Sequence, residues 1–275
     1  MKQEHGQRPN HGQKAQEPHE SFICGRNAVL AYLEGDKVKL NKVLIAQDLR
    51  PDARLERVKD LAKKQCVPVI FCERRKLDEL SGQDLRHQGI GAFLSESDLL
   101  SYDDFLELFH EEKKKREASG ANMDGYTIAI LDGIEDPHNL GAIIRSAESS
   151  GVKAVFIPKH RSTAVTATVA KTSAGALAHI PVVRITNLNR LLEALKEEGF
   201  WIAGLDVGAR DIYTKTDLVR PLAVVIGGEG EGMSRLVKEH CDLLLKIPML
   251  GKTESLNASV SAALLFYEIV RQNSR

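Results

Sequence analysis

The residues best able to do chemistry in this sequence lie in three short segments, and the first of these is residues 132–148. Apolar residues at helical spacing predict an amphipathic helix here. Asn139 and Arg145 are the polar side chains of interest. Asn139 could simply cap the helix, and Arg145 could form a surface ion pair with Glu148, three residues later. A structural and a functional interpretation are therefore both open for this segment.

The second segment, residues 227–232, reads Gly-Gly-Glu-Gly-Glu-Gly and follows an apolar run. So many glycines predict a backbone that either turns sharply or comes very close to a ligand. The segment contains neither G-x-G-x-x-G nor G-K-[ST], which argues against dinucleotide and P-loop sites. Glu229 and Glu231 would also repel a phosphate group. A ligand with an adenosine and a cationic centre fits this loop better, although a tight turn alone would also explain the glycines.

The third segment, residues 247–259, begins with Ile247-Pro248-Met249 at the end of an apolar run. We expect Ser255 to cap a closing helix that starts at Leu256. Asn257 would then lie in the first turn of that helix, where a functional role is favoured over a structural one.

Strands and helices alternate from residue 125 onward, which indicates a parallel sheet covered on both faces. Each of the three segments follows a predicted strand, and ligands of such sheets bind beyond the carboxyl ends of the strands. We expect strands at 126–131, 154–157, 182–185, 201–205, 222–226 and 243–247, and helices at 140–150, 164–178, 188–198, 234–240 and 256–272.

The residues before this domain divide into three parts. Residues 1–20 are polar and almost without apolar side chains, so we expect a disordered tail. Residues 21–98 have the pattern of a small α/β module, with helices expected at 27–33, 55–65 and 74–80 and strands at 42–46, 67–72 and 89–94. Residues 99–124 contain a charge run and are predicted to be a helical or flexible connector.

The composition excludes several classes of protein. The chain has 275 residues, and its 38 Lys and Arg balance its 38 Asp and Glu, which excludes a polybasic protein that coats nucleic acid with its whole surface. No apolar run approaches the length of a membrane span, and the first residues do not form a secretory signal. The four cysteines lack C-x-x-C spacing. We therefore expect a cytoplasmic protein with reduced thiols, no metal and no membrane partner.

Taken together, the three segments resemble a known family. N-x-G-A-I-x-R over residues 139–145, G-G-E-G-x-G over 227–232, and I-P-M with S-L-N-A-S over 247–259 are similar to the three motifs of the SpoU (TrmH) class of SPOUT RNA 2′-O-ribose methyltransferases. The stretches 24–29, 87–92 and 171–176 also resemble the RlmB subgroup, in which an L30e-like RNA-binding domain comes first. The likeness covers about residues 21–272.

The resemblance implies a fold and a site. The implied fold is a trefoil-knotted α/β methyltransferase domain, residues 125–275, preceded by a small L30e-like α/β RNA-binding domain, residues 21–98. The implied cofactor is S-adenosyl-L-methionine, contacted by Gly227, Gly228, Ile247, Met249 and Leu256. The implied catalytic residues are Arg145, Glu229 and Asn257, supported by Asn139 and Ser255. A guanidinium is a poor base, so Arg145 is expected to hold a phosphate or orient a hydroxyl, with Glu229 as a polarising partner.

The resemblance also implies a substrate and an assembly. The expected reaction is 2′-O-methylation of a guanosine ribose in 23S ribosomal RNA, and the first domain, with Arg26 and the basic cluster 74–76, is expected to bind that RNA. A transfer RNA methyltransferase of the same class and a catalytically silent RNA-binding protein are the alternatives. The closing helix is apolar nearly all round, so it is either buried at the centre of its own domain or packed on a second subunit. Together with the resemblance, this pattern predicts a homodimer with an active site shared between subunits.

Overall fold

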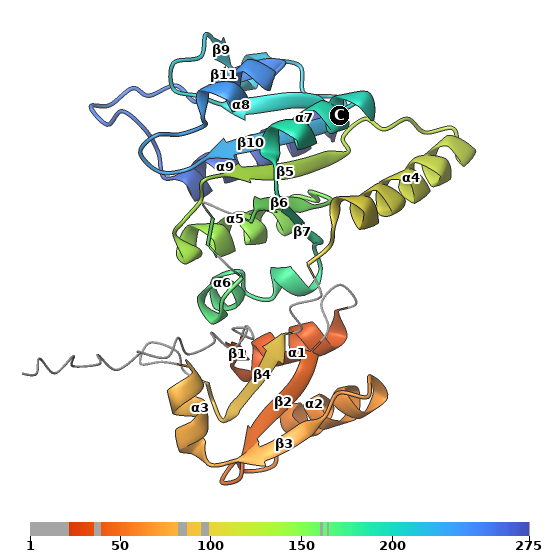
Figure 1. The fold of residues 1–275 in the computed structure, drawn as a ribbon, viewed down its shortest axis with the longest axis vertical. Coiled ribbons are helices and arrows are strands. Elements are labelled where there is room, and N and C mark those ends of the chain that lie inside the picture. Colours follow the sequence, from red (N-terminus) through yellow and green to blue (C-terminus); the bar gives the residue numbers. More distant parts are fainter. Residues whose placement is uncertain are drawn as a thin grey trace, which may run out of the picture.

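The computed structural model of the chain describes residues 22–35, 40–81, 87–94, 99–159, 162–163 and 165–274. The tail expected at residues 1–20 lies outside these residues. Figure 1 shows two sheets, a smaller one in the amino-terminal part, coloured red through orange to gold, and a larger one above it, coloured green to blue.

In its described residues, the amino-terminal domain consists of a four-stranded mixed sheet and three helices. Its central strand β2 pairs in parallel with β3 and antiparallel with β4, and β4 pairs antiparallel with β1. The strands, in sheet order, are β1 (Phe22–Cys24), β4 (Ile90–Leu94), β2 (Leu40–Ala46) and β3 (Val69–Cys72), and the helices are α1 (Arg26–Glu34), α2 (Ala53–Lys64) and α3 (Arg74–Ser81). The sequence analysis missed β1, because three residues are too few to show an alternating pattern.

The carboxyl-terminal domain contains a seven-stranded sheet in which every pair of neighbours is parallel. The strands, in sheet order, are β7 (Val182–Ile185), β6 (Val155–Pro158), β5 (Thr127–Asp132), β10 (Leu222–Gly227), β8 (Trp201–Leu205), β11 (Leu243–Lys246) and β9 (Asp211–Ile212). The parallel sheet predicted from continuous apolar strands is therefore confirmed. The short edge strand β9 was not expected.

Helices cover both faces of this sheet, as Figure 1 shows. Successive residues of β10 alternate between two hydrophobic clusters: Val224 and Ile226 pack on one side, and Ala223 and Val225 on the other. The first cluster includes residues of α5 (Pro137–Ser149) and α9 (Ala258–Asn273), and the second includes residues of α4 (Tyr102–Ala118), α7 (Leu188–Glu197) and α8 (Arg235–His240). The sheet and the helices on it thus form three layers.

The segment expected to be a connector forms the long helix α4. Ser101 caps it in a capping box with Asp104, and Phe105 and Phe109 are both 1% exposed. The ring of Phe105 meets that of Phe156 in β6 edge to face, with 4.9 Å between the ring centroids. Helix α4 therefore contributes to the core of the carboxyl-terminal domain, in addition to joining the two domains.

The single helix expected at residues 164–178 is interrupted. The structure has α6 (Ala167–Thr172) and a short 3-10 turn, η2 (Ala176–Ala178), and residue 164 lies outside the described part of the chain. Between the two, Ala174 and Gly175 have φ angles of 51° and 92°, which no helix can continue through. Periodicity could not reveal this break, because the apolar positions keep their spacing across it.

The two domains meet where α6 lies against β1 and η2 against α1. A Cβ added to Gly35, after α1, would run into the backbone of Ala178. Glycine is therefore required for this close approach. Across the described residues, none of the helices combines the length and apolar character needed to span a membrane.

Candidate active site

A cavity of about 400 Å³ lies beyond the carboxyl ends of β8, β10 and β11, which are neighbours in the sheet. The residues that line it include those expected to bind a cofactor, namely Gly227, Gly228, Ile247, Met249 and Leu256. Three of the five residues expected to be catalytic also line it: Glu229, Ser255 and Asn257. The second and third segments of the sequence analysis therefore share one cavity, which is the place that the strand-end rule predicts.

The conformation of the glycine-rich loop is fixed by hydrogen bonds to Asp132 and by close packing of the backbone. The Gly228 N–H donates to the carbonyl of Asp132 at 2.7 Å, and the side chain of Asp132 accepts from the Ser234 N–H at 3.0 Å. A Cβ on Gly227 would run into Gly232, and one on Gly228 into the carbonyl of Gly133. Both glycines are therefore needed for backbone packing, which explains part of the glycine pattern without a ligand.

Three of the predicted site residues form one hydrogen-bonded chain. The Asn257 amide donates from Nδ2 to Oδ1 of Asn139 at 2.9 Å, and the Asn139 amide in turn donates from Nδ2 to Oε1 of Glu229. Asn139 is 8% exposed, whereas Glu229 is exposed. The buried amide thus orients a carboxylate that lines the cavity.

Asn257 is the residue that caps α9, and the expectation that Ser255 caps it is wrong. The helix begins at Ala258, and Oδ1 of Asn257 accepts from the Ser259 N–H at 2.9 Å and the Ser259 hydroxyl at 2.6 Å. Ser255 is exposed and lines the cavity. The Asn257 side chain therefore has a structural role through Oδ1 and a role in the site through Nδ2. Asn139 does not cap its own helix either, because Asp136 occupies that position.

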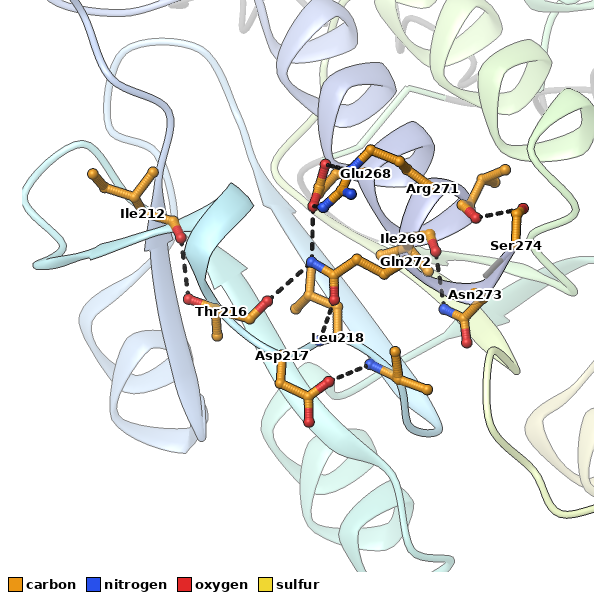
Figure 2. A network of polar contacts seen from close by, with 12 residues as sticks. Ile212, Thr216, Asp217, Leu218, Glu268, Ile269, Arg271, Gln272, Asn273 and Ser274 are labelled. Atoms are coloured by element: carbon orange, nitrogen blue, oxygen red, sulfur yellow. Dashed lines mark hydrogen bonds and ion pairs between the residues drawn. The ribbon is translucent and has the colours of Figure 1, made fainter.

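The other end of α9 is held by the polar network in Figure 2. Glu268, which is 7% exposed, accepts from Arg271 and from Gln272. Gln272 also donates to the carbonyl of Thr216 at 3.0 Å and accepts from the Leu218 N–H at 2.9 Å. These contacts tie the helix to the segment between β9 and β10, so the position of Asn257 is supported from the far end of its helix.

Arg145 does not reach the cavity of its own chain. It is exposed on α5 and has no hydrogen bond or ion pair with any described residue, so the surface pair with Glu148, which the sequence left open, is not formed. Asn139, on the same helix, reaches the site through its contacts with Asn257 and Glu229. The first segment thus contributes one residue to the hydrogen-bonded chain beside this cavity and presents the other to solvent.

The sequence analysis missed a charged pair that lines the same cavity. Asp206 and Lys238 form an ion pair there, and the Gly208 N–H donates to Oδ1 of Asp206 at 2.8 Å. Burial acts to raise the pKa of Asp206, but Lys238 and the Gly208 N–H outweigh burial and hold this pKa below its ordinary value. A usable signal existed, because Asp206 directly follows the predicted strand 201–205. In the described ranges no three His, Cys, Asp or Glu side chains gather as metal ligands would.

Comparison with known proteins identifies the class. The model of the SpoU rRNA Methylase family matches residues 126–267, and a model described as RNA 2′-O ribose methyltransferase substrate binding matches residues 22–100. The chain therefore belongs to the SpoU family, a class of RNA 2′-O-ribose methyltransferases.

Individual relatives agree with this assignment. YacO of Bacillus subtilis (strain 168), named for the TrmH family of tRNA/rRNA methyltransferases, is 44% identical over 254 residues, which cover 92% of this chain and 96% of YacO. A relative with the same family name from Staphylococcus saprophyticus is also 44% identical, over 93% of this chain and 97% of its own. Among solved structures, the SpoU methyltransferase AviRb from Streptomyces viridochromogenes, in complex with AdoMet, has a TM-score of 0.75 at 21% identity, covering 93% of this chain and 91% of AviRb. The expected SPOUT fold is thus confirmed.

Proposed function

We propose that this chain transfers a methyl group from S-adenosylmethionine to the 2′-hydroxyl of a guanosine ribose in 23S ribosomal RNA. The observation that carries the proposal is the hydrogen-bonded chain from Asn257 through Asn139 to Glu229, which places an oriented carboxylate on a cavity lined with glycine backbone. Membership of the family supports the reaction class, and the relatives' names leave both tRNA and rRNA as substrates.

The cavity has the size and chemistry that S-adenosylmethionine requires. Its volume of about 400 Å³ lies within the usual range for small-molecule sites, and Ile226, Ile247 and Leu256 supply apolar walls for an adenine. Glu229 and Glu231 favour a cationic ligand, as the sequence predicted. AviRb was solved with this cofactor. When bound, the cofactor supplies an electrophilic methyl group on a cationic sulfur.

The residues of the chain orient the other reactant. The ribose hydroxyl must lose its proton as its oxygen takes up the methyl group. In this proposal Glu229 accepts a hydrogen bond from that hydroxyl. The contacts of Glu229 with the Asn139 amide, and of Asn139 with Asn257, support this role. Such positioning lowers the barrier by fixing the reactants in a productive geometry. Ser255 is exposed on the same cavity and offers the substrate a side-chain hydroxyl as a further hydrogen-bonding group.

Ribosomal RNA is favoured over transfer RNA by the amino-terminal domain. A complete α/β domain precedes the methyltransferase domain, and a substrate-binding family model matches it over residues 22–100. We assign RNA binding to residues 21–98 and catalysis to residues 125–275. A catalytically silent RNA-binding protein would not need an oriented Glu229. All four cysteines are free thiols, which favours the cytoplasm as the location.

A homodimer would complete the site. Four apolar side chains form an exposed stripe at helical spacing along α9 and the residue before its cap, namely Leu256, Val260, Leu264 and Tyr267. Arg145, which does not line the cavity of its own chain, would then serve the cavity of the partner subunit, either by holding a substrate phosphate or by orienting the hydroxyl.

The function is tested by mapping ribose methylation. Ribosomal RNA and transfer RNA from cells that lack the gene are incubated separately with the purified chain and S-adenosylmethionine carrying a labelled methyl group. We expect label in 23S ribosomal RNA at a single guanosine, together with resistance of the next phosphodiester to alkali, because alkaline cleavage requires a free 2′-hydroxyl. Label in transfer RNA alone would support the alternative substrate, and no label in either RNA would overturn the proposal.

A further inference from the structure

Two adjoining hollows lie away from the methyltransferase cavity, and they form one groove that reaches from the amino-terminal domain to the other domain. One hollow, of about 320 Å³, lies between residues 24–28 and residues 170–175. The other, of about 400 Å³, lies on the amino-terminal domain and shares Arg26 and Gln88 with the first. The groove is thus lined by β1, α1 and α6 and continues toward α2 and α3.

Among the described residues that line this groove, every charged side chain is positive. These side chains are Arg26, Arg54, Arg74 and Lys171. Arg54, Arg74 and Lys171 are exposed. Arg74 forms an ion pair with Asp48 at 2.9 Å and Arg26 forms one with Asp52, so these two charges are partly offset. Arg54 and Lys171 add to the positive potential of the groove from one domain each.

Arg26 is held in place at the centre of the groove. One terminal nitrogen of its guanidinium forms an ion pair with Asp52, and Nε donates to the carbonyl of Gln88 at 3.4 Å. The second terminal nitrogen has no hydrogen-bond partner among the described residues, so it can donate to a ligand. Asp52 orients the guanidinium and is not itself a lining residue of either hollow.

The backbone on both sides of the groove is strained. Gln88 and Ala174 have φ angles of 53° and 51°, and both line the hollow between the domains. Only three non-glycine residues in the described part of the chain have positive φ, so two of the three face this hollow. Residues held in such conformations gather at binding sites, where the surrounding structure keeps them in place.

We propose that this groove binds the phosphate backbone of single-stranded RNA, with Arg26 and Arg54 of the amino-terminal domain and Lys171 of the methyltransferase domain contacting one strand. The inference rests on the proposed function, and it adds a binding site formed by both domains. A single phosphate would not need cations on two domains, whereas a polyanion spans them. The described lining residues include no aromatic side chain for base stacking, so the contacts hold the strand independently of its sequence.

The test compares two double variants of the full chain. Arg54→Gln with Lys171→Gln removes one groove cation from each domain. Lys64→Gln with Lys153→Gln removes one exposed cation from each domain outside the groove. Binding of a 20-nucleotide single-stranded RNA is measured by fluorescence anisotropy at several salt concentrations. Loss of two phosphate contacts should reduce the slope of log affinity against log salt by about 1.4.

We expect the reduced slope in the groove variant only. Equal slopes for the two double variants would overturn the proposal. RNA that contains 4-thiouridine should also cross-link to the peptides around 24–28 and 170–175, and cross-links to the amino-terminal domain alone would contradict a site formed by both domains.

A separate arm distinguishes this inference from the proposed function. Methyl transfer to ribosomal RNA and calorimetric binding of S-adenosylmethionine are measured on the unmodified chain. If methyl transfer is absent while the groove variant still shows the reduced salt slope, the proposed function fails and the groove stands. If methyl transfer occurs but both slopes are equal, the groove fails alone.

Discussion

The side-chain amide of Asn257 donates a hydrogen bond to Oδ1 of Asn139 at 2.9 Å across 118 residues of sequence. The same Asn257 side chain caps α9 through its other amide atom, Oδ1. One side chain therefore couples the start of the last helix to the carboxylate of Glu229 through Asn139.

Asn257→Asp separates these two roles. The aspartate keeps the oxygen that caps α9 but replaces the donor toward Asn139 with an acceptor, so Asn139 loses its fixed orientation. We expect methyl transfer to fall about 100-fold with little change in the melting temperature. Asn257→Ala should also lose the cap, which costs about 1 kcal/mol of stability. If kcat of Asn257→Asp stayed at the unmodified level, the amide chain would have no part in catalysis.

Arg145→Ala should remove activity without removing stability. The side chain is exposed and without a partner among the described residues, so the free energy of unfolding should change by less than about 0.5 kcal/mol. Loss of a charge that acts on the reacting groups should lower kcat at least about 100-fold, with the affinity for S-adenosylmethionine unchanged. Glu148→Gln on the same helix is the control and should remain active. Full activity in Arg145→Ala would exclude the guanidinium from the reaction.

Gly228→Ala should damage the cavity through the backbone alone. The added Cβ would run into the carbonyl of Gly133, so the glycine-rich loop must shift. We expect a loss of at least tenfold in affinity for S-adenosylmethionine, which corresponds to about 1.4 kcal/mol. Gly251→Ala is the control, because a Cβ there would meet nothing within 4 Å. Calorimetric titration of both variants with S-adenosylmethionine measures these affinities. Equal affinities of Gly228→Ala and Gly251→Ala would show that the loop tolerates the shift.

The ion pair of Asp206 and Lys238 should give a stability difference that depends on pH. The pKa of Asp206 is lower in the folded chain than in the unfolded chain, so its contribution is present above the ordinary Asp pKa and is lost as pH falls through the folded value. The free energies of unfolding of Asp206→Asn and of the unmodified chain should differ by at most about 1 kcal/mol at pH 7. That difference should shrink below about pH 4. A difference that persists undiminished at lower pH would contradict the assigned cause.

Leu264→Glu should separate the subunits of the proposed dimer. Leu264 lies within the exposed apolar stripe of α9 and is 37% exposed. Sedimentation of the unmodified chain should give about twice 30.4 kDa, and the variant should give the mass of one chain because a buried unpaired carboxylate is costly. Leu108→Glu, on α4 and also 37% exposed, should leave the dimer intact. A monomeric unmodified chain at micromolar concentration would contradict the dimer.

The sequence by itself determined the sheet and the location of the site. Continuous apolar strands alternating with helices require a parallel sheet with two covered faces, and polar residues after such strands lie at one edge. For this reason Gly227 and Ile247, which were both expected to contact the cofactor, line one cavity. Periodicity is a local property, so it predicts elements well wherever they are long.

Only the tertiary structure decided which side chains meet. Asn257 rather than Ser255 caps α9 because the helix begins at Ala258, two residues later than the apolar pattern predicts. The pairing of Asp206 with Lys238 joins the loop after β8 to α8, and no local pattern specifies a contact between residues so far apart in sequence. The position of Arg145 outside its own cavity likewise depends on how α5 packs on α9. These relationships are set by the order of strands in the sheet, which brings β10, β8 and β11 together although the chain visits them in another order.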